Sequence, residues 1–507
     1  MSNKIISPNQ LKNISFKAKK NNKKIVLVHG VFDVVHIGHI HHFIEAKKYG
    51  DLLVLSITGD KFVNKGFNKP YFDEERRSLF LASLEVVNYV VINQNKSAYE
   101  IIKKLKPNVY CKGPDYKKKS GDLAGNLEKE RNTVNKYGGK LIITKGERFS
   151  STKLLNNKFE DFNPGQTKIN ELLINDHEKT KIKEEFSKVL TKVKKEKVLV
   201  IGEVILDEYR YSTPIGTPSK ENILSVKYEN KKTFIGGTVP VVKTISELNK
   251  NVTFVSLFKK KNIQHLIKKN LGKSAKCHLF YEKNFKEIYK TRFIDINNKQ
   301  KFFEFYDFNN IEYNNSSLFK YLNKNLSKFD KVILCDFGHG IFNEKITRLI
   351  QKKSKYLCAN IQTNSGNRGF NLFTKYSKLD FLCIDEPEAR LGLKDRFSPI
   401  NELIKSNLLK NYKNIIITRG IMGLIIKLDK SNKKILKFPA LNTKVVDTLG
   451  AGDAVYSYCS SLIRNTNNHK LISIVGAIAG AIKTNILGHS TNIQLDEVNR
   501  SLETILK

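Results

Sequence analysis

The sequence contains no tryptophan and only two methionines among its 507 residues, and its six cysteines are scattered along the chain. None of the cysteines forms a C-x-x-C spacing, which argues against a disulfide framework or a structural zinc site. The longest run of small apolar residues, 472–482, is short, interrupted by glycine and followed by a lysine. We therefore expect a buried helix there and no membrane span. No positively charged segment followed by an apolar stretch opens the chain, which predicts a cytoplasmic protein.

Basic residues outnumber acidic ones, with 89 lysines and arginines against 49 aspartates and glutamates and a formal net charge of +40. A charge of this size is typical of nucleic-acid-binding proteins. Here, however, the lysines are spread along the whole chain and no DNA-binding or RNA-binding motif occurs. The abundance of lysine, asparagine, isoleucine, phenylalanine and tyrosine is typical of AT-rich coding. We therefore expect no nucleic-acid partner, while the basic surface should attract nucleotides and sugar phosphates.

The length of the chain predicts two or three domains. Residues 22–156 alternate apolar strands with helical segments, which predicts a small Rossmann-like α/β domain. Residues 157–195 are polar and rich in lysine and glutamate, and we expect a linker with one or two surface helices. Residues 196–507 open with an apolar strand and are predicted to form a second α/β domain. The expected strands of the two domains include residues 25–28, 52–57, 89–92, 108–111, 140–144 and 198–202.

Two histidines, His36 and His39, lie in the segment G-V-F-D-V-V-H-I-G-H over residues 30–39. An apolar strand precedes this segment and a helix that ends at a glycine follows it. The amides and the dipole of a first helical turn favour an anion. Imidazoles placed there can donate hydrogen bonds to phosphate oxygens that gain charge in a transition state. The segment therefore predicts a phosphate site that also includes Gly30, Phe32 and Asp33.

The whole segment resembles the HxGH nucleotidyltransferase superfamily of small cytidylyltransferases and adenylyltransferases. Further short motifs match that family in the same order. The resemblance implies that Lys47 binds phosphate during catalysis, that Arg77 contributes to the acceptor site, and that Lys112 belongs to a K-G-x-D-Y-like nucleotide-binding segment. It also implies that the nucleotide phosphates are held by the hydroxyls and helix start of Ser150, Ser151 and Thr152.

The chemistry that suits these residues is attack of a phosphate monoester on the α-phosphate of an NTP, with release of pyrophosphate. A phosphate monoester has a second pKa of about 6, so the nucleophile is largely ionised at neutral pH and needs no strong base. The protein has to align the groups and neutralise their charge. A divalent metal, Mg²⁺, is expected to bridge the phosphates. The product would be a nucleotide-activated sugar or polyol.

The sequence D-T-L-G-A-G-D over residues 447–453 is a second motif, placed before a predicted helix over 454–463. Gly450, Ala451 and Gly452 can offer backbone amides to a phosphate at that helix start. Asp453 is placed to take a proton from an attacking hydroxyl. The motif resembles that of the ribokinase (PfkB) family of carbohydrate kinases.

This second resemblance implies an ATP-dependent sugar kinase of ribokinase-like α/β fold, with Mg²⁺ as cofactor. Its substrate would be bound by Asp207, Gly236, Gly237 and Arg292. Thr418 and Gly420 would lie near the nucleotide. Asp385 and Glu388 stand at the family's N-x-x-E position and would hold Mg²⁺ and phosphate indirectly.

Three departures from the family pattern affect the kinase prediction. Residues 238–240 read T-V-P and lack the substrate-binding asparagine of the G-G-A-x-N pattern. Asp385 replaces the asparagine of N-x-x-E. Residues 360–371 are rich in amides where many relatives have a D-P-K-like turn, so this segment is either an ordinary polar loop or an altered sugar site. Because Asp453 and its glycine turn are present we expect kinase activity, the alternative being a pseudo-kinase that binds a ligand or holds a dimer.

An HxGH domain joined to a ribokinase-like domain resembles the bifunctional heptose kinase/adenylyltransferases, with the order of the domains reversed. The resemblance implies that the kinase phosphorylates a sugar phosphate at its anomeric hydroxyl and that the transferase adds a nucleotide to the new phosphate. The predicted product is a nucleotide-activated sugar of the ADP-heptose type for surface-polysaccharide synthesis. The alternative is a cytidylyltransferase that makes a CDP-activated polyol or sugar, with a kinase-like domain that is non-catalytic or acts on another sugar. The choice between ATP and CTP and between monomer and homo-oligomer stays open.

Overall fold

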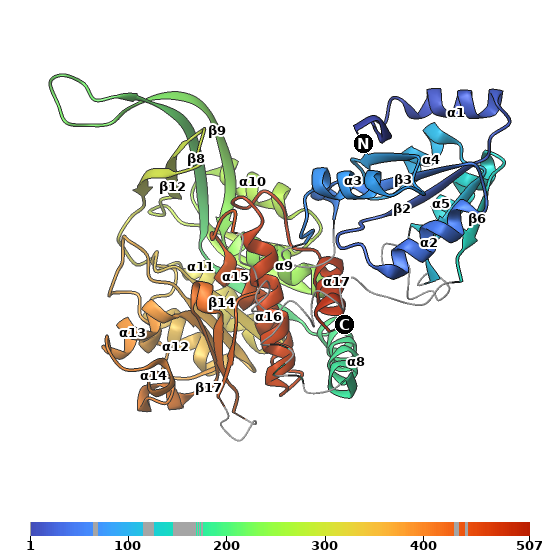
Figure 1. The fold of residues 1–507 in the computed structure, drawn as a ribbon. Helices are drawn as coiled ribbons and strands as arrows, with labels where there is room; N and C mark the ends of the chain where they lie inside the picture. The colour runs from blue at the N-terminus through green and yellow to red at the C-terminus, as the bar shows by residue number, and fades with distance from the viewer. Residues whose placement is uncertain are drawn as a thin grey trace. The chain divides into compact units, whose positions relative to one another are not determined.

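A computed structural model of the chain describes residues 2–63, 69–114, 126–145, 169, 171, 173, 176–429, 435–441 and 445–506 (Figure 1). The chain divides into two compact units, Met1–Thr167 and Lys168–Leu502. Within the described residues, no helix combines the length and the hydropathy that a membrane crossing requires.

The first unit is built on a parallel sheet with strand order β1-β4-β3-β2-β5-β6. Its strands are β1 (Ile5–Ile6), β2 (Ile25–Gly30), β3 (Leu52–Thr58), β4 (Tyr89–Asn93), β5 (Val109–Lys112) and β6 (Lys140–Ile143). Its helices are α1 (Leu11–Lys20), α2 (Ile37–Lys47), α3 (Glu74–Ser83), α4 (Tyr99–Leu105) and α5 (Leu127–Lys136). This unit therefore begins before residue 22, because β1 and α1 belong to it.

Helices cover both faces of this sheet. One apolar cluster joins Val26 and Val28 of β2 to buried residues of α2 and α3. A second cluster joins Ile25 and Leu27 of the same strand to α1, α4 and α5. Strands buried on both faces read as continuous apolar runs, which is why the sequence predicted them so closely. The prediction of a Rossmann-like α/β domain is confirmed.

The second unit has two sheets. A nine-stranded sheet has the order β11-β10-β7-β14-β15-β16-β17-β18-β19, and its strands run parallel from β11 to β17. These strands are β7 (Val198–Gly202), β10 (Val252–Phe258), β11 (Lys276–Tyr281), β14 (Lys331–Asp336), β15 (Leu357–Ile361), β16 (Leu379–Asp385), β17 (Tyr412–Thr418), β18 (Leu424–Lys427) and β19 (Ile435–Phe438). The four-stranded sheet consists of β8 (Val204–Gly216), β9 (Ser225–Gly237), β12 (Ile288–Asp295) and β13 (Lys301–Asp307). In Figure 1, β8 and β9 form a long hairpin that extends away from the nine-stranded sheet.

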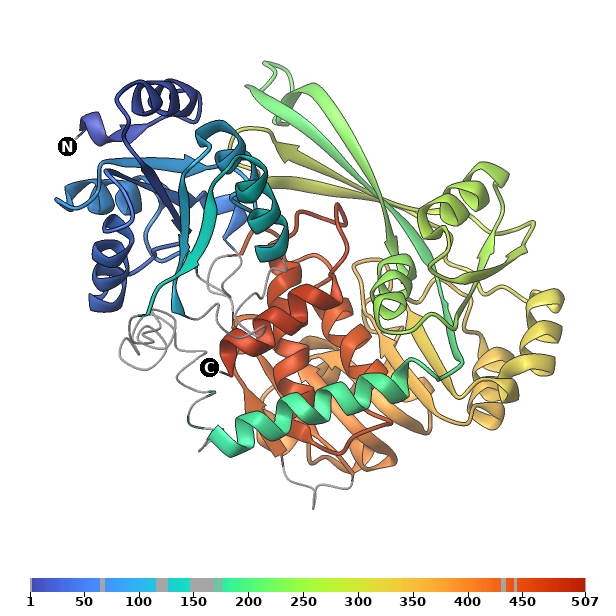
Figure 2. The same cartoon turned by 90° about the vertical axis from the view of Figure 1, so that its right-hand side faces the viewer.

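The helices of the remaining chain are α8 (Asp176–Val193), α9 (Thr238–Leu248), α10 (Lys261–Leu271), α11 (Ser316–Asn325), α12 (Glu344–Lys353), α13 (Glu386–Leu393), α14 (Ile400–Leu403), α15 (Ala451–Leu462), α16 (His469–Thr484) and α17 (Leu495–Ile505). Helix α16 contains the apolar run 472–482 and is buried, as predicted. The predicted linker ends in α8, whose buried residues Ile182, Phe186, Val189 and Val193 follow a helical spacing. Figure 2 shows α8, in green, lying along helices of the second unit, where it packs on α15.

Candidate functional site

The first candidate site forms where β2 leads into α2, at the carboxyl edge of its sheet. His36 is the N-cap residue of α2, and its ring stacks on that of His39, with centroids 4.0 Å apart. The ring of Phe32, which is 6% exposed, packs edge-on against His39. A Cβ on Gly30 would lie 2.8 Å from the Phe32 ring, so glycine is needed for this packing. The structure thus brings these four predicted residues together at a helix start suited to phosphate.

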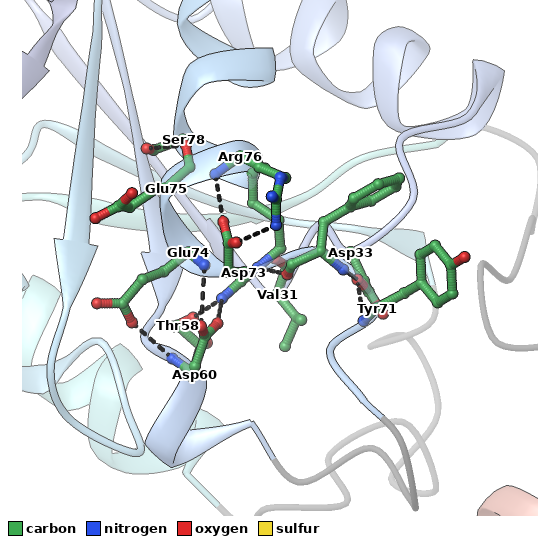
Figure 3. A network of polar contacts seen from close by, with 12 residues as sticks. Val31, Asp33, Thr58, Asp60, Tyr71, Asp73, Glu74, Glu75, Arg76 and Ser78 are labelled. Atoms are coloured by element: carbon green, nitrogen blue, oxygen red, sulfur yellow. Dashed lines mark hydrogen bonds and ion pairs between the residues drawn. The ribbon is translucent and has the colours of Figure 1, made fainter. Parts of the chain in front are cut away.

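Asp33, also predicted for this site, fixes the turn that carries the histidines. Its Oδ1 accepts hydrogen bonds from the backbone N–H groups of Tyr71, at 2.7 Å, and Phe72, at 3.0 Å (Figure 3). Half-buried Lys69 lies beside this carboxylate, and burial lowers the pKa of its ammonium while the charge of Asp33 raises it. Sequence reasoning did not single out Lys69. Its position after the second strand and shortly before the helix of Arg77 is the signal that could have found it.

Arg77 ties three segments of the first unit together. Its side chain is fully buried and donates to the carbonyl oxygens of Phe72, Val31 and Thr58 at 2.6–2.9 Å, and to Asp60 Oδ1 at 2.6 Å. Figure 3 shows this part of the fold, in which the turn after β2, the end of β3 and the start of α3 meet. Every nitrogen of the guanidinium is engaged. The geometry therefore favours a positioning role for Arg77 over the predicted contact with an acceptor.

We expect Arg77→Met to weaken this end of the sheet. The buried carbonyl groups lose their donor, so the local free energy of unfolding should fall by about 2–4 kcal/mol. Hydrogen exchange of the β2 and β3 amides in the full chain measures this change. Arg76→Met is the matched control, because the exposed Arg76 pairs only at the surface with Asp73, and its effect should stay within about 0.5 kcal/mol. Equal protection in the two variants would contradict the positioning role.

Two predicted lysines lie differently from the expectation. Lys47 donates to Asn88 Oδ1 at 2.8 Å and to the carbonyl oxygen of Asp51, the residue before β3. It thus lies at the amino edge of the sheet, opposite the histidines, and the catalytic role predicted for it needs correction. Lys112 is 5% exposed, and its Nζ lies 3.4 Å from Glu130 Oε2 in a buried ion pair, which favours a structural role over the predicted phosphate contact. The predicted phosphate ligands Ser150, Ser151 and Thr152 lie outside the described residues.

The second candidate site is a cavity of about 490 Å³ in the second unit. Several of its walls come from the carboxyl ends of parallel strands, where open α/β sheets bind their ligands. Most of the residues that the sequence predicted for the kinase site line this one cavity. They are Asp207, Gly237, Arg292, Asp385, Glu388, Thr418, Gly420, Gly450, Ala451, Gly452 and Asp453.

Asp453 lies in the first turn of α15, directly after the glycine-rich segment. Gly450 is the N-cap residue of this helix. The N–H of Ala451 donates to the carbonyl oxygen of Thr448 at 3.2 Å, and the next first-turn amides, of Gly452 and Asp453, are of the kind that a helix leaves for an outside acceptor. Burial raises the pKa of Asp453 to about 6, and a hydrogen bond from Gln362 opposes that rise. Above about pH 6 the carboxylate is ionised and can accept a proton.

Asp385 and Glu388 form a capping box at the start of α13. Asp385 Oδ1 accepts from the backbone N–H of Glu388 at 2.6 Å, and Glu388 Oε2 accepts from that of Asp385 at 2.8 Å. Burial raises the pKa of Asp385, and burial with the charge of Asp385 raises that of Glu388 to about 8. A hard divalent cation prefers such oxygen ligands and would offset the repulsion between the two carboxylates. The pair therefore fits the predicted indirect Mg²⁺ role.

Asp207 reaches the cavity from β8 and is 3% exposed. Its Oδ1 accepts from Arg292 Nη1 at 2.6 Å, and Arg292 Nη2 lies 2.7 Å from Glu304 Oε2. Gly236 does not line the cavity, but a Cβ there would lie only 2.0 Å from Asp207 Oδ2. Gly236 therefore makes room for the carboxylate that was predicted to bind the sugar.

The amide-rich segment over residues 360–371 supports this site. Gln362 Nε2 donates to Asp453 Oδ1 at 2.6 Å, and the backbone N–H of Thr363 donates to Glu388 Oε1 at 2.9 Å. Asn364 and Asn367 anchor the segment by donating, each at 2.8 Å, to the carbonyl oxygen of Phe337. Sequence reasoning noticed the amides but missed Gln362. Its place directly after a buried strand at the cavity edge was the available signal.

We expect Gln362→Leu to shift the pH dependence of the kinase reaction. The hydrogen bond from Gln362 stabilises ionised Asp453 and lowers its pKa. Without it the pKa rises, so the acid limb of kcat/KM should move to higher pH and the rate at neutral pH should fall. A pH profile of ADP formation measures the shift. Asn364→Leu is the control, since Asn364 bonds to the backbone and not to Asp453. An unchanged acid limb in Gln362→Leu would contradict this effect of Gln362 on the pKa of Asp453.

The glycine-rich helix start, the buried carboxylate of Asp453 and the paired carboxylates lie around one cavity of an α/β fold, an arrangement that suits phosphoryl transfer. Residues 195–482, more than half of the chain, match the pfkB family of carbohydrate kinases, and the chain belongs to this family. Residues 27–157 match the cytidylyltransferase-like family.

Two curated relatives illustrate the similarity. The chain is 36% identical over 151 residues to a protein of Aliarcobacter butzleri named "Bifunctional protein HldE", an alignment that covers 29% of this chain and 31% of the relative. It is 43% identical over 142 residues to the Campylobacter jejuni protein of the same name, covering 27% of this chain and 28% of the relative. The matched part is thus less than a third of either relative's length.

Solved structures of ribokinases also resemble the chain. The ribokinase of Thermotoga maritima is 20% identical, with a TM-score of 0.49, over 61% of this chain and 99% of that chain. The Arabidopsis thaliana ribokinase complexed with ribose and ATP is 15% identical, with a TM-score of 0.48, over 62% of this chain and 99% of that chain.

Proposed function

We propose that the chain is a bifunctional sugar kinase and nucleotidyltransferase that makes a nucleotide-activated sugar, with an ADP-heptose type of product as the leading candidate. The observation that carries this proposal is the pairing, in one chain, of a pfkB domain containing Asp453 with a cytidylyltransferase-like domain containing the stacked His36 and His39. Relatives named as bifunctional HldE proteins support the heptose assignment.

In the kinase step, the hydroxyl oxygen of the sugar attacks the γ-phosphorus of ATP and ADP leaves. The hydroxyl proton passes to the carboxylate of Asp453, which the amide of Gln362 holds in place. The first-turn amides of α15 bind the transferred phosphoryl group. Mg²⁺, when held through water by Asp385 and Glu388, supplies positive charge to the phosphates. The amide-rich segment contacts both Asp453 and Glu388, so it holds the proposed general base and the proposed Mg²⁺ ligand in a fixed relative position.

In the transferase step, an oxygen of the new sugar phosphate attacks the α-phosphorus of the NTP, and pyrophosphate leaves. The nucleophile is already ionised at neutral pH, so no general base is required. His36 and His39 donate hydrogen bonds to phosphate oxygens that gain charge as the bond to pyrophosphate breaks. Their fixed stacking at the start of α2 supplies the alignment that this displacement needs.

Pyrophosphate release and ADP formation by the purified chain test the proposal, across the four NTPs and a panel of sugars and sugar phosphates. Pyrophosphate release with ATP and heptose 1-phosphate, abolished in His36→Ala, would support the ADP-heptose assignment. Absence of both products with every substrate pair would overturn the bifunctional assignment.

A second candidate is a cytidylyltransferase that makes a CDP-activated polyol or sugar. The cytidylyltransferase-like match over residues 27–157 favours it. Pro240, which replaces an expected substrate-binding asparagine, favours a kinase-like domain that is non-catalytic or acts on another sugar. Pyrophosphate release with an acceptor and CTP, but with none of the other three NTPs, would select this candidate.

A further inference from the structure

A second cavity, of about 480 Å³, adjoins the kinase site. It shares Gly450, Asp453 and His489 with the first cavity, but its other walls come from β9, α9, α10, α15, α16 and the segment after α16. Its size is within the range of small-molecule sites. Apart from Gly450 and Asp453, none of the predicted site residues lines it, so the kinase reaction as described leaves this space without a role.

The walls of the second cavity carry more positive than negative groups. Lys243 of α9 and Lys483 of α16 line it, and Asp453 is the acidic residue in its lining. Lys483 is 5% exposed and donates to the carbonyl oxygen of Gly488 at 2.6 Å, which uses one of the three donors of its ammonium group. Within the described part of the chain, half-buried Lys243 has no carboxylate at ion-pair distance. Burial lowers the pKa of both lysines. The charges of Asp447, Asp453 and Asp207 oppose that effect at Lys483, whereas burial acts alone at Lys243.

His489 supplies a buried polar atom with no partner. Its side chain is 7% exposed and lines both cavities, and its Nε2 lies 4.0 Å from Asp207 Oδ2. Its Nδ1 is buried and has no hydrogen-bond partner among the described residues. Burial, together with the charge of Lys483, lowers its pKa to about 3, so the imidazole is neutral at physiological pH. A buried nitrogen left unpaired is unfavourable, and a ligand that bonds to it removes that penalty.

We propose that this second cavity binds a phosphate monoester group, with Lys243, Lys483 and His489 as its protein ligands. Lysine ammonium groups bind phosphate as point charges, and a neutral imidazole can donate one further hydrogen bond to a phosphate oxygen. Thr491 and Asn492, in the same lining, add polar groups at this end of the cavity. The phosphate is carried either by the acceptor of the kinase, a source that rests on the proposed function, or by a separate small molecule bound next to Asp453.

Calorimetric titration of the full chain with inorganic phosphate tests the site. A non-hydrolysable ATP analogue, present at saturation, occupies the nucleotide sites beforehand. We expect phosphate to bind the wild-type chain, and Lys243→Gln to weaken that binding by about tenfold, the loss typical of one charge-assisted hydrogen bond. Lys269→Gln is the control, because it removes the same charge from an exposed position of α10 that does not line the cavity. Equal phosphate affinity in Lys243→Gln and wild type, or no binding to wild type, would overturn the proposal.

Kinase assays distinguish the two sources of the phosphate group. If the acceptor carries it, Lys243→Gln raises KM for a sugar phosphate and leaves KM for the unphosphorylated sugar unchanged. If a separate molecule carries it, inorganic phosphate alters the rate without competing with the acceptor, and Lys243→Gln abolishes that effect. The calorimetric titration needs no turnover. Phosphate binding without any ADP formation would therefore count against the kinase function and not against the site.

Discussion

Asp453→Asn is expected to lower ADP formation by about 100-fold to 10,000-fold, the contribution of a positioned general base. Asparagine has nearly the size of aspartate, so the cavity should keep its shape. Its amide cannot take the proton of the attacking hydroxyl at neutral pH. A coupled ADP assay with ATP and the acceptor measures the loss. The wild-type rate should itself rise as Asp453 ionises, because its pKa is raised to about 6.

The pyrophosphate assay on the same Asp453→Asn protein is the control. The substituted residue lies in the second unit, so pyrophosphate release at the first unit should be unchanged. ADP formation close to the wild-type rate would contradict the assignment of Asp453 as the base. Wild-type protein that releases pyrophosphate but forms no ADP with any acceptor would instead support a non-catalytic kinase-like domain.

His36→Ala is expected to lower pyrophosphate release by about 100-fold to 1,000-fold, the loss typical of one hydrogen-bond donor to transition-state charge. The imidazole is the N-cap of α2 and stacks on His39, so its removal also leaves the second ring without its packing partner. Release of pyrophosphate from ATP and from CTP, each with its acceptor, measures the effect.

His41→Ala is the matched control for this prediction. His41 lies on the same helix, is exposed, and has no assigned chemistry. Its replacement should leave pyrophosphate release close to wild type, while His39→Ala should lower it as His36→Ala does. A His36→Ala variant that releases pyrophosphate as fast as His41→Ala would contradict the catalytic assignment.

The sequence predicted the strands of the first unit closely, because parallel strands buried on both faces leave a direct pattern. For the second unit it predicted an α/β domain and the opening strand, but not the separate four-stranded sheet. The predicted strand over 52–57 is β3 (Leu52–Thr58), and that over 89–92 is β4 (Tyr89–Asn93). Short motifs predicted the two candidate sites for a related reason. In each motif, the glycine turn, the helix start and the residues with catalytic side chains are neighbours in the chain. Their order in the sequence is therefore enough to predict how they are arranged in space.

Contacts between distant segments could not be predicted in this way. Two acceptors of Arg77 lie on the turn after β2 and at the end of β3, and no local pattern indicates that its side chain points inward. Lys47 occupies a position that the motif associates with phosphate, yet α2 carries it to the other edge of the sheet, where Asn88 binds it. The bond between Gln362 and Asp453 joins residues 91 positions apart. In α8, by contrast, the helical spacing of the buried apolar residues is present in the sequence. The polar composition around them led to the prediction of a surface helix in a linker.

The close approach of Gly236 to Asp207 restricts how this site can evolve. A Cβ at position 236 would lie 2.0 Å from the Asp207 carboxylate, so a larger residue there displaces a carboxylate that Arg292 holds in place. Replacing Asp207 first leaves Arg292 with one buried partner fewer. Each single replacement thus disturbs the buried contact between Asp207 and Arg292. Descendants that acquire a new acceptor are expected to inherit these two positions as a pair and to vary the other walls of the cavity.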